Sequence, residues 1–99
     1  MKTKIHVCYI LYNPVLDRYY IGSTSNLADR LQRHNQGRSK ATKAGAPHWE
    51  LKRCEEFDTL SQARRREAFL KRMKSRLFVE KLIASTPDPH SSVGFEHPD

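Results

Sequence analysis

Four side chains in the first third of the chain carry the groups that phosphate chemistry uses. Tyr9 and Tyr20 lie in two short apolar segments, and Arg30 and His34 follow at a spacing of one helical turn. An arginine offsets negative charge that develops on phosphate oxygens, and a histidine hydrogen-bonds a phosphate or relays a proton. A phenol acts as a base only if nearby cations, here Arg18, Arg30 and a bound metal ion, lower its pKa from about 10. These residue types predict a phosphate site.

The same residues also have plain structural interpretations. Strand tyrosines usually pack in a core or an interface, which is what we expect of Tyr12 and Tyr19. The arginine and histidine, taken alone, would suit a solvated helix face. In an antiparallel hairpin, however, the phenols of Tyr9 and Tyr20 can converge on one spot. The functional interpretation therefore depends on these residues acting together.

Glu67 could supply the metal ligand that such a site requires. The alternative is an i,i+4 salt bridge to Lys71, which is worth about a few tenths of a kcal/mol. Glu67 shares a helix face with Ala63 and Leu70, so its carboxylate can point inward, where it needs a partner. A single carboxylate together with substrate phosphate oxygens suits Mg²⁺, which keeps most of its water ligands. We expect Glu67 to bind Mg²⁺ or Mn²⁺.

Turn residues divide the chain into the elements that must position these groups. Asn13-Pro14 interrupts a run of β-forming residues, because proline donates no backbone N–H and restricts the residue before it. The segment 38–47 is basic and rich in small residues, and is interpreted as a mobile loop that a ligand could order. Gly37 can end the helix before it. We expect strands at 5–12, 18–22 and 49–57, helices at 26–35 (capped by a hydroxyl from 23–25), 60–74 and 76–84, and a flexible tail at 86–99.

The charge of the chain indicates a polyanionic partner. Its 18 basic and 11 acidic residues leave a net charge of +7, which favours phosphate contacts with counterion release. The alternative is that the excess only keeps the protein soluble. Because the basic residues cluster at 30–43 and 64–81, we expect nucleic acid. The expected contacts are Arg18, Arg33, Arg38, Lys40, Lys43, Arg64 and Lys71.

The apolar run near the start of the chain and the two cysteines indicate the compartment and the cofactors to expect. The apolar run at 5–11 is too short for a membrane span or a signal segment. Cys8 and Cys54 form no CxxC pair and no zinc pattern, and are expected to be reduced thiols of a cytoplasmic protein. We expect neither a membrane partner nor an organic cofactor.

The order and spacing of these residues resemble the GIY-YIG endonuclease superfamily. Its first motif is similar to Val7-Cys8-Tyr9, and its second to Tyr20-Ile21-Gly22. Arg30, His34 and Glu67 match the positions that follow in the family pattern. The resemblance covers about residues 5–83, with His34-Asn35-Gln36-Gly37, Thr42 and 47–50 similar to the small bacterial members that resemble the nuclease domain of excinuclease C. Val7 replaces a glycine and Cys8 an apolar residue, and neither change removes a catalytic group.

The resemblance implies an α+β fold, with a three-stranded antiparallel sheet flanked by helices, over a domain at 1–85. It also implies a metal-dependent endonuclease that hydrolyses DNA phosphodiesters, structured or repair-intermediate DNA included. One of Tyr9 and Tyr20 would deprotonate the attacking water and the other would position water or phosphate. Arg30 would stabilise the transition state, His34 would assist near the phosphate, and Glu67 would hold the ion.

Within these 99 residues we expect no second DNA-binding domain of the kind that many nucleases of this family use to choose their targets. The alternative function is therefore a nucleic-acid-binding module that turns over poorly or not at all. A further alternative is an accessory subunit of a repair or recombination complex.

Overall fold

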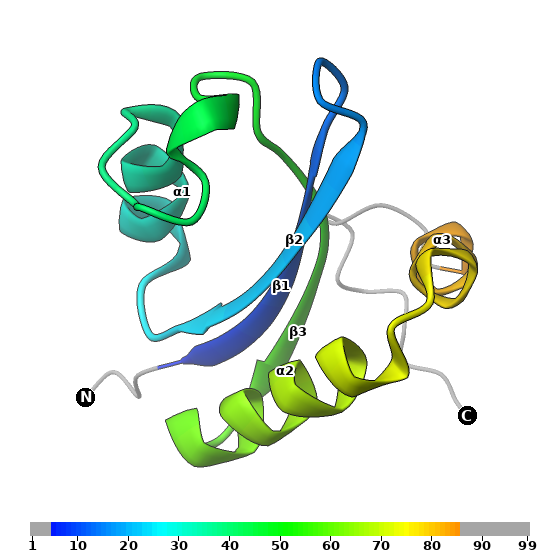
Figure 1. The fold of residues 1–99 in the computed structure, drawn as a ribbon. Coiled ribbons are helices and arrows are strands. Elements are labelled where there is room, and N and C mark those ends of the chain that lie inside the picture. The colour runs from blue at the N-terminus through cyan, green and yellow to red at the C-terminus, as the bar shows by residue number, and fades with distance from the viewer. Residues whose placement is uncertain (1–4, 86–99) are drawn as a thin grey trace.

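The structure, a computed structural model, describes residues 5–85 as an antiparallel sheet of three strands with helices on both faces (Figure 1). The strands are β1 (His6–Asn13), β2 (Arg18–Thr24) and β3 (Glu50–Phe57), in the spatial order β2-β1-β3. The helices are α1 (Leu27–Asn35), η1 (Lys43–Gly45), α2 (Leu60–Met73) and α3 (Arg76–Ala84). The expected α+β fold is confirmed. Residues 1–4 and the tail predicted at 86–99 lie outside the described part of the chain.

Strand β1 occupies the centre of the sheet, and its alternating side chains build two cores. On one face Val7, Tyr9 and Leu11 pack with Trp49, beneath α1. On the other face Cys8 and Ile10 pack with Leu70 of α2 and Val79 of α3. Figure 1 shows α1 and η1 on one side of the sheet and α2 and α3 on the other. A side chain therefore belongs to one face or the other according to its strand parity.

The β1–β2 hairpin is closed by a buried side chain. The Asn13 side-chain oxygen accepts hydrogen bonds from the backbone N–H groups of Val15 and Leu16, each at 3.0 Å. Its amide nitrogen donates to the carbonyl of Gly45 at 2.7 Å. A single asparagine therefore fixes both the hairpin turn and the distant η1 segment.

Strand β2 is longer than the sequence predicts. It continues past Gly22, because Ser23 and Thr24 pair with Cys8 and Val7 of β1. The N-cap of α1 is consequently Asn26, whose side chain accepts from the N–H of Asp29, and the hydroxyl cap predicted within 23–25 is wrong.

The segment 38–47, predicted as a loop, consists of turns and the short helix η1, which packs next to α1. Thr42 and Gly45 are buried, and η1 forms between them. The Trp49 indole N–H donates to the carbonyl of Thr42 at 2.9 Å, and the backbone N–H of Trp49 donates to Asn35. These contacts span 7 and 14 positions of the chain, and local composition does not reveal them.

The predicted starts of the last two helices are confirmed. Thr59 caps α2 in a capping box with Gln62. Ser75 caps α3, after Lys74 ends α2 in the left-handed conformation. These helices place Glu67 and Lys71 against the edge strand β2, because α2 packs mainly on β2 and β1.

Candidate active site

Tyr9, Tyr20 and His34 meet on the α1 face of the sheet. The Tyr9 phenol oxygen lies 2.9 Å from His34 Nε2. The Tyr20 ring centroid lies 4.9 Å from that of His34 and 6.3 Å from that of Tyr9. The two tyrosines converge because they lie on neighbouring strands, β1 and β2, and both side chains point to the same face of the sheet. Tyr12 and Tyr19 instead stack on each other at 4.8 Å, among the side chains of the opposite face.

His34 connects the phenol to the segment around η1. Its Nδ1 lies 2.6 Å from the hydroxyl of Thr42, and both side chains are almost fully buried. The chain Tyr9–His34–Thr42 is continuous, so a proton that reaches the phenol has a path to the imidazole. Thr42 is held in turn by the Trp49 indole.

Burial dominates the electrostatics of this cluster. It raises the pKa of the Tyr9 phenol above its ordinary value, with a smaller rise from Tyr20, whereas Arg30 lowers the pKa through its charge and a hydrogen bond. Burial and the charge of Arg30 lower the pKa of His34. At neutral pH Tyr9 is therefore protonated and His34 is neutral. Arg30 lowers the phenol pKa as expected, but burial outweighs this effect.

Gly22 is part of this geometry. A Cβ at this position would lie 2.5 Å from the Tyr9 phenol oxygen and 3.0 Å from a ring carbon of Tyr20. Both tyrosines thus close over the backbone of residue 22, which is why the second motif ends in glycine.

Glu67 reaches β2 from the opposite layer. Its Oε1 accepts from the hydroxyl of Ser23 at 2.6 Å, and its Oε2 lies 2.6 Å from the ammonium of Lys71. The Lys71 ammonium also lies 5.8 Å from the Tyr20 ring centroid. Since β2 is an edge strand, Lys71 joins the carboxylate on one face to the phenol on the other. The inward orientation and the salt bridge are both present, although the sequence posed them as alternatives.

The donor set around Glu67 fits one kind of ion. Within residues 5–85 no group of three His, Cys, Asp or Glu side chains could hold a metal, whereas a closed zinc site needs four ligands of this kind. A half-buried carboxylate oriented by a serine suits a hard cation that takes its other ligands from water and phosphate.

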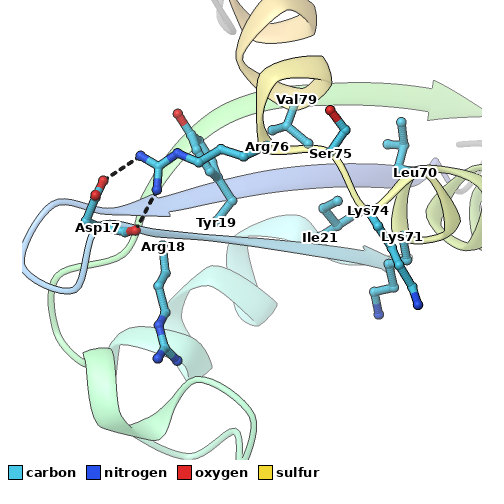
Figure 2. A pocket seen from close by; sticks show the side chains of 10 residues that line it. All are labelled: Asp17, Arg18, Tyr19, Ile21, Leu70, Lys71, Lys74, Ser75, Arg76 and Val79. Atoms are coloured by element: carbon cyan, nitrogen blue, oxygen red, sulfur yellow. Dashed lines mark hydrogen bonds and ion pairs between the residues drawn. The ribbon is translucent and has the colours of Figure 1, made fainter.

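The predicted nucleic-acid contacts lie at the surface, and two of them form ion pairs with acidic residues. Arg33 pairs with Asp29 at 3.2 Å, and Lys71 pairs with Glu67. Figure 2 shows Arg18 turned away from α3, towards the η1 side, while Arg76 pairs with Asp17. The remaining members are exposed: Arg38, Lys40, Lys43 and Arg64. The structure brings none of these four into the tyrosine cluster.

Sequence reasoning missed two supporting residues, Ser23 and Thr42. It interpreted Ser23 as a helix cap and noted Thr42 only as part of a family pattern. A serine directly after the second-motif glycine was the available signal, since parity puts it on the face opposite Tyr20. The two cysteines behave as expected: both are free, and burial raises the pKa of Cys8 to about 12 and of Cys54 to about 11.

Tyr9, Tyr20 and His34 thus meet on the α1 face of the sheet, and Glu67 lies against the edge strand from the other layer. Residues 5–81 match the GIY-YIG catalytic domain, and the protein belongs to this family of nucleases. Comparison with curated proteins and with solved structures gave no significant match. No helix within residues 5–85 is long and apolar enough to cross a membrane.

Proposed function

We propose that the protein is a metal-dependent endonuclease that hydrolyses phosphodiester bonds of DNA, with structured or repair-intermediate DNA among its substrates. The observation that carries this proposal is the 2.9 Å contact between the Tyr9 phenol and a neutral His34, beside Arg30 and Tyr20. A buried phenol paired with an unprotonated imidazole can accept a proton and pass one on. The net charge of +7 supports a polyanionic substrate.

The residues divide into a substrate-facing set and a proton-accepting set. Tyr20 and Arg30 are half-exposed, and they orient the water and the phosphate and stabilise charge on its oxygens. As the water attacks, its proton passes to the Tyr9 oxygen, and the Tyr9 proton passes to His34 Nε2. This requires the tautomer in which Nδ1–H donates to Thr42, in agreement with the 2.6 Å contact.

Glu67 would hold Mg²⁺ or Mn²⁺, which, when bound, supplies positive charge to the phosphate oxygens and the leaving group. Ser23 keeps the carboxylate oriented by donating to Oε1. The position of this carboxylate on α2, against the edge strand that carries Tyr20, supports the assignment.

The test is nicking of supercoiled plasmid and of branched DNA with Mg²⁺ or Mn²⁺. We expect the wild-type protein to nick at least one substrate and Glu67→Ala to lose the activity while retaining DNA binding. Glu56→Ala, an exposed carboxylate of β3, is the matched control and should remain active. Binding by wild type without cleavage of any substrate would disprove the enzymatic proposal.

The second candidate function is a nucleic-acid-binding module that does not cut, acting alone or as an accessory subunit. It is favoured by one observation: both oxygens of Glu67 already have partners within the protein. In that case binding would depend on salt and would survive Glu67→Ala, with no metal-dependent activity in any variant.

A further inference from the structure

Within residues 5–85, the ion pair between Lys71 and Glu67 differs from the two other i,i+4 pairs. Arg33–Asp29 and Arg76–Glu80 are about half exposed on both sides, as is usual for surface pairs. The Glu67 side chain is only 22% exposed. The distance from Lys71 Nζ to Glu67 Oε2 is 2.6 Å, shorter than the nitrogen–oxygen distances of 3.2 Å and 2.9 Å in the other two pairs. The pair at Glu67 is thus the tightest and least solvated of the three.

We propose that Lys71 is a built-in competitor for the metal: its ammonium occupies the Glu67 carboxylate of the metal-free protein and must leave before a divalent cation binds. The inference rests on the proposed function, because it takes Glu67 as the metal ligand. It assigns Lys71 a positioning role, in which the lysine sets how readily Glu67 accepts the ion.

The argument begins with the two carboxylate oxygens. Ser23 donates to Oε1 as a neutral hydroxyl, and this contact is compatible with a cation at Oε2. Lys71 places a full positive charge at Oε2, the position that the cation would take. Two cations cannot share one carboxylate oxygen at this range without strong repulsion. The metal and the ammonium therefore bind alternatively.

The Lys71 side chain also has open space beside it into which it can move. A pocket of about 320 Å³ lies between β2, the end of α2 and the start of α3, and Lys71 and Lys74 line it together (Figure 2). Arg76 lies in the same wall, but Asp17 already pairs with it. Open space beside a half-exposed lysine lets its side chain swing out without repacking of the core.

The test measures metal binding without catalysis. Mn²⁺ is titrated into full-length wild type, Lys71→Met, Lys74→Met and Glu67→Ala, and free Mn²⁺ is followed by electron paramagnetic resonance. Lys71→Met should bind Mn²⁺ about tenfold more tightly than wild type, because one unit charge close to the ion is removed. Lys74→Met is the matched control, since it removes the same charge three residues away, and its affinity should stay within about twofold.

A second readout follows the ammonium group itself. In a ¹⁵N-labelled wild-type protein, Mg²⁺ should shift the Lys71 side-chain ammonium signal towards that of a free lysine, and should leave the Lys74 signal unchanged. Equal affinities of Lys71→Met and Lys74→Met, in a wild type that binds Mn²⁺ through Glu67, would overturn the competitor role alone. Absence of Mn²⁺ binding in every variant would instead remove the metal assignment of Glu67, and the inference with it.

Discussion

Position 22 has no room for a side chain, because the side chains of Tyr9 and Tyr20 lie against its backbone. An alanine Cβ would lie 2.5 Å from the Tyr9 phenol oxygen. We predict that Gly22→Ala lowers the free energy of unfolding by about 1–3 kcal/mol, the usual cost of overpacking, and displaces the phenol from His34. Thermal unfolding and plasmid nicking would check both effects. Gly37→Asn is the contrasting variant: its φ of 73° suits asparagine, so stability should change little.

The Tyr9 hydroxyl is the group that links the proposed site to His34. Tyr9→Phe removes the group that contacts His34 Nε2 and interrupts the proton path. We expect kcat for cleavage to fall by about 10²–10⁴-fold, the usual contribution of general acid–base catalysis, with KM for DNA nearly unchanged. Tyr19→Phe is the matched control, because Tyr19 precedes Tyr20 but packs on the opposite face. A Tyr9→Phe protein that cuts at the wild-type rate would exclude Tyr9 from the chemistry.

At the scale of elements, His34 couples α1 to β1 and to the η1 segment, which makes stability depend on pH. The folded protein holds His34 with a lowered pKa, so the unfolded chain binds the proton more tightly. The stabilising effect is complete above about pH 6.5, the ordinary histidine value, and is lost as pH falls from there through the folded pKa. The carboxylates of Asp17 and Glu55, whose pKa values are lowered, act in a more acidic range.

We therefore predict that the midpoint of thermal unfolding falls between pH 6.5 and 5, and that His34→Gln removes most of this slope. Glutamine can still hydrogen-bond Tyr9 but does not titrate in this range. Melting curves of both proteins at several pH values would check the prediction. Identical slopes for the two proteins would show that other groups carry the pH dependence.

The elements whose signals are local could be predicted from the sequence. The segments 5–12 and 49–57 were predicted as strands and form β1 and β3. The helices predicted at 60–74 and 76–84 start at the first residues of α2 and α3, directly after the caps Thr59 and Ser75. The end of β2 and the fold of residues 38–47 could not be predicted. Ser23 stays in the strand because it pairs with Cys8 and bonds Glu67, 44 positions away.

The candidate site also has a part that could be predicted from the sequence and a part that could not. Tyr9, Tyr20 and His34 were brought together by strand parity and helical spacing, which a sequence displays. The order of the η1 segment depends on Thr42 and on the Asn13 contact to Gly45, which only the folded chain brings together. Glu67 points inward to Ser23 and also pairs with Lys71. Both contacts are possible because β2 is an edge strand, so that Lys71 can reach the carboxylate past its edge.

On the scale of the whole molecule, the net charge of +7 determines how binding responds to salt. If DNA contacts about six phosphates, the logarithm of the binding constant should fall against the logarithm of salt concentration with a slope of about −5. Lys40 and Lys43 flank the segment that holds Thr42, and both are exposed. The η1 segment, which begins at Lys43, lies on the α1 side of the sheet (Figure 1), the side on which Tyr9 and Tyr20 meet His34.

We predict that Lys40→Ala and Lys43→Ala each weaken DNA binding and reduce the salt slope by about one unit, because each removes one phosphate contact. The cleavage rate at saturating DNA should stay at the wild-type value, since neither side chain contacts the tyrosine cluster. Lys81→Ala is the control: it removes one exposed charge from α3, on the opposite face of the sheet, and should leave the slope unchanged. Fluorescence anisotropy over a range of salt concentrations gives the slopes. A wild-type slope near zero would mean that the excess charge serves solubility alone, and equal effects of all three substitutions would show that total charge, rather than the α1 side of the sheet, governs binding.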